Sequence, residues 1–137
     1  MWRVLWVALL LAGCAQLPPT PQDLQAKRFE TLPDKGVIYV VRPLPDFSND
    51  PTPVILGDHA QITTYPGTYY RWEVEPGVHR IEGFGGDNGR IAVRAEAGRL
   101  YFVEQRVSQF FRFHQSYFIL IPEPHGRAAV NRAELVP

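Results

Sequence analysis

The sequence predicts an all-β fold: a single antiparallel β-sandwich, or a partly open barrel, of about seven or eight strands. Three observations predict it. From Gly36 onward, short runs rich in β-branched and aromatic residues are separated by turn residues. Several of these runs alternate apolar with polar side chains, which is the period of a half-buried strand. Helical periodicity is nearly absent before Pro122, as expected of a sandwich or barrel.

The first expected strand covers residues 37–41, which are apolar on both faces, as in a central strand. Pro43 and Pro45 end it, and the proline-punctuated stretch 44–53 is expected to be a loop. Residues 54–62 then predict a tight hairpin.

The clearest strand signal is the alternation over residues 68–74, which predicts a half-buried antiparallel strand with an outward face that carries Glu73. The opposite, buried face holds Tyr70, Trp72 and Val74. A turn at residues 75–77 leads to a return strand over 78–82, because Pro76 presets one backbone angle and Gly77 accepts a positive one.

The second half of the chain repeats this arrangement. Residues 90–96 and 100–107 predict a strand pair, and a last strand over 117–121 stops at Pro122. The Ala-rich tail, residues 127–135, is expected to form one or two helical turns.

The N-terminal residues predict a processing signal. Arg3 precedes an uncharged apolar run, residues 4–12, which is far shorter than the ~20 residues that cross a bilayer. Polar, proline-rich sequence follows at 16–25, so a buried helix is disfavoured. The run closes on Leu11, Ala12, Gly13 and Cys14, which look like the bacterial lipobox.

That resemblance implies that Cys14, the only cysteine, carries a diacylglyceryl group and an N-acyl chain such as palmitate. It also implies three segments: a signal peptide at 1–13, the lipidated Cys14 with a tether at 14–35, and the β-sandwich at 36–137. Phe29 and Leu32 are expected to mark where the tether docks. Several acyl chains make attachment effectively permanent, whereas one chain binds only marginally. Ala15 resembles default sorting to the outer membrane, facing the periplasm.

The composition limits the number of domains and the kind of partner. The mature part, residues 14–137, has 124 residues and fits one domain with one core. Loss of Arg3 leaves 13 basic and 14 acidic residues, and this near balance argues against a nucleic-acid partner. Acylation of Cys14 leaves no thiol, so packing alone is expected to hold the domain together.

Four segments carry a family resemblance: residues 27–29, 37–40, 67–79 and 95–103. Over residues 27–121 the chain resembles an uncharacterised bacterial lipoprotein family known only as a domain of unknown function. Its Glu-Pro-Gly-x-His turn is also similar to small β-sandwich modules named for a Pro-Glu-Gly-Ala motif, which are taken to be binding or spacer modules. The resemblance implies no catalytic residues.

The residues alone also predict neither an enzyme nor a metal site. The four histidines are widely spaced, without the close pair typical of zinc sites, and no G-x-S-x-G motif occurs. His79 is expected to be a core or semi-buried residue with its ring bonded to the backbone. Carboxylates such as Glu73 and Glu96 are expected to pair with arginines across strands. No cofactor beyond the acyl chains is expected, and a hydrolase is the least favoured class.

Two stretches are candidate contact sites. One is a glycine-rich loop that leads into a strand rather than a helix, so it does not predict a phosphate cradle but remains a candidate binding loop. Its residues are Gly83, Phe84, Gly85, Gly86, Asp87 and Asn88. The other is the aromatic stretch Phe110, Phe111, Arg112 and Phe113. These aromatics either cap one end of the core or form an exposed aromatic–arginine partner patch.

The sequence therefore predicts a lipid-anchored cell-envelope protein that acts as a binding, scaffold or accessory module, with an envelope protein as possible partner. The alternative is a lipoprotein that recognises envelope glycan or peptide through loops 83–89 and 44–53. A concave pocket that gathers His79, Trp72 and a carboxylate would favour ligand binding or hydrolysis.

Overall fold

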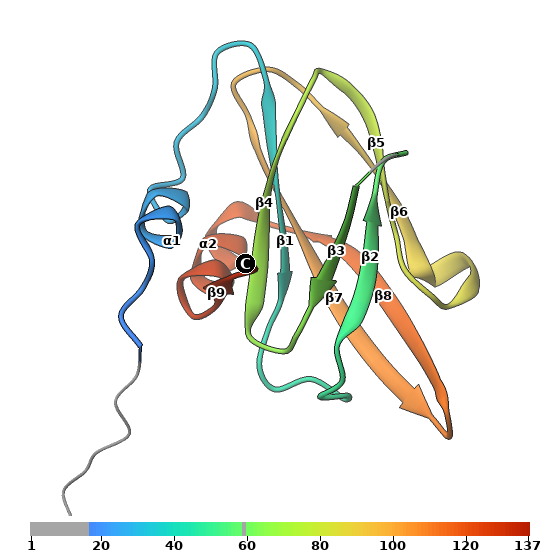
Figure 1. Cartoon of the computed structure of the whole chain (residues 1–137). Helices are drawn as coiled ribbons and strands as arrows, with labels where there is room; N and C mark the ends of the chain where they lie inside the picture. The colour runs from blue at the N-terminus through green and yellow to red at the C-terminus, as the bar shows by residue number, and fades with distance from the viewer. Residues whose placement is uncertain (1–16, 59) are drawn as a thin grey trace, which may run out of the picture.

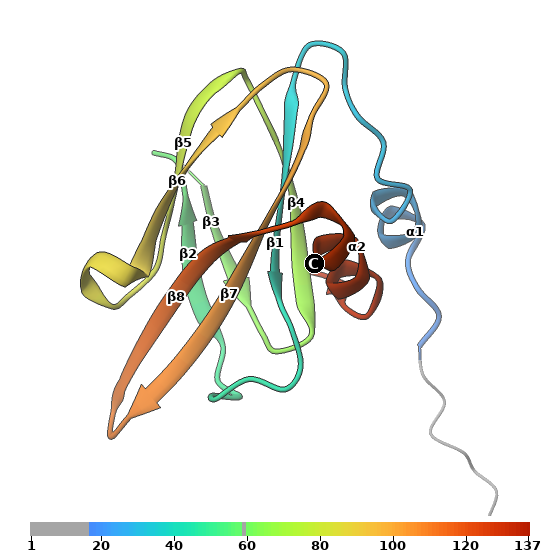
Figure 2. The ribbon, with the colours of Figure 1, turned by 180° about the vertical axis from the view of Figure 1, so that it is seen from behind.

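The computed structural model describes residues 17–58 and 60–137. The proposed signal peptide and Cys14 lie outside the described residues. Two stacked β-sheets form the body, and two short helices cover the outer face of the larger sheet (Figures 1 and 2). The elements are α1 Pro21–Ala26, β1 Gly36–Arg42, β2 Thr52–Leu56, β3 Ala60–Thr64, β4 Thr68–Val74, β5 Gly77–Glu82, the 3₁₀ turn η1 Gly86–Gly89, β6 Arg90–Ala95, β7 Leu100–Phe110, β8 Phe113–Ile121, α2 Glu123–Asn131 and β9 Glu134–Leu135.

The larger sheet has the order β8-β7-β1-β4-β9 and the smaller one β3-β2-β5-β6. The expectation of a mostly β, two-sheet fold is confirmed, and both sheets are open rather than closed into a barrel. The larger sheet is mixed, however, because β1 runs parallel to β7 and β4 parallel to β9. The purely antiparallel sheet predicted from the sequence is therefore wrong. The chain crosses to the smaller sheet twice between β1 and β7, and each strand's own periodicity does not encode that order.

Strand β1 is the centre of the molecule, as its two apolar faces predict, and every residue in it is buried. Tyr39 and Val41 pack toward the helices, in one core cluster. Ile38 and Val40 pack toward the smaller sheet, in the other. Burying a side chain of this size stabilises the fold by about 1.5–3 kcal/mol, so β1 supports both layers.

The chain packs on the sheet earlier than Phe29. Thr20 caps α1 by accepting a hydrogen bond from the backbone N–H of Asp23 at 3.1 Å. Pro21 begins the helix, where its missing N–H costs nothing. Asp23, Ala26 and Phe29 are all buried. Residues 20–29, expected to be tether, thus form part of the packed body.

Docking of α1 changes the environment of β4. Its alternation is as predicted, with Val74, Tyr70 and Trp72 toward the inter-sheet core. The other face is not simply solvated, because Tyr69 is completely buried beneath the helices. The outward face therefore divides along the strand: Tyr69 is covered and Glu73 is exposed.

The C-terminal helix starts four residues before the expected tail helix. Gly126 permits its close packing on β7, because a Cβ atom there would lie 2.1 Å from Cγ of Phe102. The predicted hairpin over 54–62 is confirmed as β2 and β3. The β7–β8 hairpin is longer than expected, since its strands extend to Phe110 and Phe113.

Candidate functional site

The tip of the β7–β8 hairpin exposes three phenylalanines. Phe110, Phe111 and Phe113 are 71, 79 and 72% exposed, and Arg112 between them is exposed too. The interpretation of these aromatics as a cap on the core is therefore wrong. Hydrophobic burial, which usually places such residues inside, does not act here because the hairpin projects beyond the body of the sandwich (Figure 1).

The hairpin turn is also conformationally unusual. Phe111 has a φ of 54°, in the left-handed region that glycine normally occupies at this position of a two-residue turn. A side chain there costs roughly 1–2 kcal/mol. The ring of Phe111 stands edge-on to that of Phe110, with centroids 4.5 Å apart. An exposed aromatic residue is thus held where neither burial nor turn geometry favours it.

The glycine-rich loop lies beside this hairpin. The backbone N–H of Ser116 donates a hydrogen bond to the carbonyl of Phe84 at 2.6 Å. Gly83 allows the approach, because a Cβ atom there would lie 2.8 Å from the Ser116 side chain. A hollow of about 460 Å³ opens between the two segments, lined by Phe84, Gly85, Arg112, Phe113, His114 and Gln115. The two candidate stretches that the sequence treats separately form one surface.

Other exposed apolar side chains lie at the same end of the sandwich. Leu44 and Phe47 project from the β1–β2 loop and Tyr65 from the β3–β4 turn. Both connections lie at the end toward which the β7–β8 hairpin points, in both views (Figures 1 and 2). We call the hairpin tip, this loop and this turn the hairpin end.

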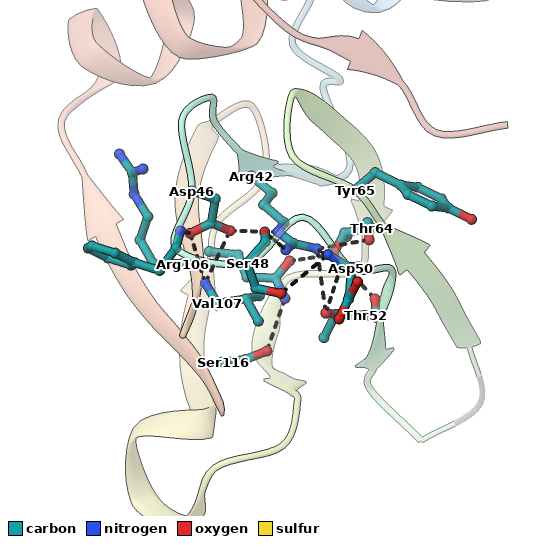
Figure 3. Close-up of polar contacts among 12 residues, drawn as sticks. Arg42, Asp46, Ser48, Asp50, Thr52, Thr64, Tyr65, Arg106, Val107 and Ser116 are labelled. Carbon is teal, nitrogen blue, oxygen red and sulfur yellow. Dashed lines mark hydrogen bonds and ion pairs between the residues drawn. The ribbon is translucent and has the colours of Figure 1, made fainter. Parts of the chain in front are cut away.

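A buried arginine fixes the β1–β2 loop. Arg42 is fully buried at the end of β1, and its Nε donates to Oδ2 of Asp46 at 2.7 Å (Figure 3). Its Nη2 donates to the carbonyl of Ser48 at 2.7 Å, and its Nη1 to the carbonyls of Asp50 at 2.8 Å and Thr64 at 3.1 Å. The loop thus wraps around a guanidinium group whose charge the Asp46 carboxylate balances.

The same carboxylate ties the loop to β7. Oδ1 of Asp46 accepts hydrogen bonds from the backbone N–H groups of Phe47 at 2.8 Å and Val107 at 3.1 Å. The edge of β7 beyond β1 is therefore paired with a side chain instead of a strand. Asp46 has no exposed side-chain surface, so this ion pair belongs to the interior.

A second buried chain of hydrogen bonds joins the two sheets. Thr64 Oγ1 donates to Oε1 of Gln105 at 2.8 Å, and Nε2 of Gln105 donates to Oγ of Ser116 at 3.1 Å (Figure 3). In the described part of the chain, every buried side-chain nitrogen and oxygen has a hydrogen-bond partner. These hydrogen bonds offset the cost of burying polar groups between the sheets.

The N-terminal segment is held by a third set of contacts. Tyr69 donates its hydroxyl proton to Oδ1 of Asp23 at 2.7 Å, and Lys27 Nζ lies 3.1 Å from Oδ2. Lys27 also donates to the carbonyl of Ala133 at 2.6 Å, and Tyr39 donates to that of Ala26 at 2.6 Å. Burial raises the pKa of Tyr69, and its hydrogen bond to Asp23 adds to the rise.

A separate hollow of about 520 Å³ gathers His79, Trp72 and the carboxylate of Asp58. The Trp72 and His79 rings stand nearly perpendicular, with centroids 5.4 Å apart. Nε2 of the half-buried His79 lies 2.6 Å from the Glu75 carbonyl, which confirms the predicted ring–backbone bond. That bond occupies one ring nitrogen. The hollow offers an aromatic surface, a carboxylate and a guanidinium from Arg80, a set suited to binding.

Within residues 17–58 and 60–137, no group of three His, Asp or Glu side chains lies close enough to hold a metal ion. None of the helices in these same segments is both long and apolar enough to cross a membrane. His59, which follows Asp58 at the second hollow, lies outside the described residues.

Comparison of the chain with protein-family models, with curated proteins and with solved structures finds no match. The resemblance to the uncharacterised lipoprotein family therefore stays a prediction.

Sequence reasoning missed Arg42, Asp46 and Gln105. Arg42 closes an apolar strand and is followed four residues later by an acid, a spacing that signals an ion pair only once a loop is known to fold back. Gln105 has no such neighbour in sequence, because its partner Thr64 comes from the other sheet.

Proposed function

We propose that this chain is a lipid-anchored cell-envelope protein, attached through Cys14 to the outer membrane on the periplasmic side, and that it works as a binding or accessory module. The observation that carries the proposal is the exposure of Phe110, Phe111 and Phe113 on a hairpin fixed to the sandwich. We assign it no catalytic step.

Exposed aromatic side chains at this density require a reason. Burying one phenylalanine stabilises a fold by about 1.5–3 kcal/mol. Because these three side chains are exposed, they do not contribute this free energy to folding. Contiguous apolar surfaces of this kind mark contacts with proteins or membranes. The Arg42 and Gln105 networks fix the β1–β2 loop and the base of the hairpin, and ordering these segments in advance lowers the entropy lost on contact.

The test is photo-crosslinking in the native host, with p-benzoylphenylalanine in place of Phe111 in the full chain. We expect a discrete adduct that is lost when Cys14→Ser prevents anchoring. The matched control carries the same probe in place of Arg99, an exposed residue at the opposite end. The adduct is with a protein or with lipid, and mass spectrometry distinguishes the two. Equal adduct yields from the two positions, or no adduct of either kind at position 111, would remove the binding role from the hairpin end.

A second candidate function is recognition of a small envelope ligand in the hollow beside Trp72. Aromatic faces with a few charged groups are typical of glycan and peptide sites, and this hollow has them. Two of the three tryptophans precede Cys14, so Trp72 is the only tryptophan of the processed chain. Its fluorescence would report binding directly.

We would titrate the processed protein with soluble peptidoglycan fragments. A saturable change in Trp72 emission, weakened by Asp58→Asn and unaffected by Glu96→Gln, would support this role. Emission that stays constant over the whole titration would remove it.

A further inference from the structure

We infer that the hairpin end lies in the interface of the bilayer that carries the anchor, so that Phe110, Phe111 and Phe113 contact lipid. The inference rests on the proposed function, because it takes Cys14 to be acylated. It deepens that proposal by naming the component that the hairpin end contacts.

The chain between lipid and domain is short. Two residues separate Cys14 from Leu17, the first described residue, so the distance from Cys14 to Leu17 is about 11 Å at most. From Thr20 onward the chain is fixed, through the bonds of Asp23 to Tyr69 and of Lys27 to Ala133. The anchor therefore has little slack. A small folded domain is about 30 Å across, so little room remains for a partner protein between the bilayer and the nearest part of the sandwich.

The chain leaves the sandwich beside strand β9 and the start of β4. Leu17, Pro18 and Pro19 line a hollow together with residues 133–135. Glu134 pairs with Thr68 at the start of β4, and its N–H bonds to the Gly67 carbonyl. That point directly follows the Tyr65 turn of the hairpin end. Both ribbon views place the first described residues in the lower half of the molecule, where the tip of the β7–β8 hairpin also lies, although the two are on opposite sides of the sandwich (Figures 1 and 2).

The two ends differ in the side chains that they expose. The hairpin end exposes Leu44, Phe47 and Tyr65 besides the three hairpin phenylalanines, and its polar contacts include His114 Nε2 with Asp50 Oδ2 at 2.8 Å. The opposite end is formed by residues 32–35 and by the turns at 75–77 and 96–99, and we call it the turn end. Its side chains include the ion pairs Lys35–Glu75 at 3.7 Å and Arg99–Glu96 at 3.3 Å. A bilayer surface favours the first set and a water-facing surface the second.

The chemistry of the tip fits an interfacial depth. Aromatic side chains gather where headgroups meet acyl chains, and an arginine there keeps its guanidinium among the phosphates while its stem lies in apolar surroundings. Arg112 sits between Phe111 and Phe113 in this way. The backbone at the turn, which lacks full pairing, stays at the level of the polar headgroups because unpaired N–H and C=O groups are costly in hydrocarbon.

The experiment uses the full chain, processed and acylated in a bacterial host and reconstituted into vesicles of phosphatidylethanolamine and phosphatidylglycerol. Acylation occupies the only native cysteine, so Phe111→Cys introduces a single thiol for a bimane label. Arg99→Cys is the matched control at the turn end. Mass spectrometry checks the acyl chains, flotation checks attachment, and the melting temperature checks folding. Phosphatidylcholine with a doxyl group near the headgroup then quenches labels that touch the bilayer.

We expect several-fold stronger quenching and a blue-shifted emission at position 111, with the label at position 99 as exposed as free dye. A chain that floats and carries its acyl groups, but shows the same weak quenching at both positions, overturns the inference and leaves the anchor intact. A protein adduct from the crosslinking probe at 111, combined with an unquenched label, assigns the hairpin end to an envelope protein and also overturns it. A chain that is neither acylated nor vesicle-bound removes the proposed anchor and this inference together.

Discussion

At the turn end of the sandwich the chain is joined by backbone hydrogen bonds, whereas at the hairpin end a buried arginine side chain is added to backbone bonds such as that from the Gly67 N–H to the Arg42 carbonyl at 2.7 Å. Gly98 donates its N–H to the Lys35 carbonyl at 3.0 Å, and Val37 donates to that of Arg99 at 3.0 Å. The hairpin end has a long β1–β2 loop, and Arg42 supplies the hydrogen bonds that a strand partner would otherwise supply. One end is stabilised by ladder geometry and the other by a buried charge.

The difference shows how a small domain can keep apolar side chains on its surface without folding them into the core. A loop held by backbone turns alone would be free to fold Phe47 inward over the core. The Arg42–Asp46 pair fills that space with groups that require complete hydrogen bonding. The aromatic side chains therefore stay outside, and the turn end, which has no such task, carries exposed ion pairs of small energetic value.

The largest expected effect tests this difference directly. Arg42→Met keeps the side-chain volume but leaves the buried Asp46 carboxylate without its counter-charge. We expect a loss of about 3–5 kcal/mol in the free energy of unfolding, measured by urea denaturation. Arg99→Met, at the turn end, should change it by no more than about 0.5 kcal/mol. Equal losses from the two variants would show that the ends are not held differently.

A smaller effect is expected where the N-terminal segment docks. Tyr69→Phe removes the hydroxyl that binds Asp23, while Lys27 and the Leu135 N–H remain on the carboxylate. A buried acceptor that loses one partner costs about 1–3 kcal/mol. Tyr65→Phe is the control, since that side chain is exposed. A melting temperature of the Tyr69 variant equal to that of the control would contradict the docked arrangement.

The same tyrosine gives the domain a pH dependence. Burial and the bond to Asp23 raise the folded-state pKa of Tyr69 above its ordinary 10.0. Above pH 10.0 the unfolded chain releases this proton while the folded chain keeps it, so unfolding is favoured as pH rises. We expect stability to fall above that pH, and to fall less steeply in Tyr69→Phe. Burial raises the pKa of Tyr39 in the same direction, so part of the fall should remain. A pH profile of urea midpoints that is the same for the wild type and Tyr69→Phe would contradict this assignment.

These contacts show what the sequence could and could not predict. Strands β1 and β4 are predictable from the sequence, because the spacing of apolar residues indicates which faces of a strand are buried. The parallel pairing of β1 with β7 and the burial of Tyr69 depend on segments far apart in the chain, so local pattern cannot contain them. For the three hairpin phenylalanines, the sequence left burial and exposure open. The same residues could lie in the core or outside it, and the length of the hairpin decides which.

A still smaller effect sharpens the account of the hairpin turn. Phe111→Gly removes a side chain from a left-handed backbone conformation, which should stabilise the fold by about 1 kcal/mol. Arg112→Gly is the matched control at the other turn position, because the positive φ belongs to residue 111 alone of the two. It should destabilise slightly, through the greater freedom of glycine in the unfolded chain. A gain at 112 with none at 111 would mean that the turn has a different geometry.

The smallest effect on stability is expected at Phe111 and Phe113, where substitution should weaken contact outside the fold most. The double variant Phe111→Ser with Phe113→Ser should unfold within about 0.5 kcal/mol of the wild type, because both side chains are solvent-exposed. Phe102→Ala lies on the same hairpin but in the buried core, and it should lose about 3–5 kcal/mol. The same residue type then separates the two roles: at 102 it holds the helices to the sheet, and at 111 and 113 it serves contact outside the fold. If the double variant instead unfolded as readily as Phe102→Ala, the hairpin aromatics would be part of the core and the contact surface would have to be sought elsewhere.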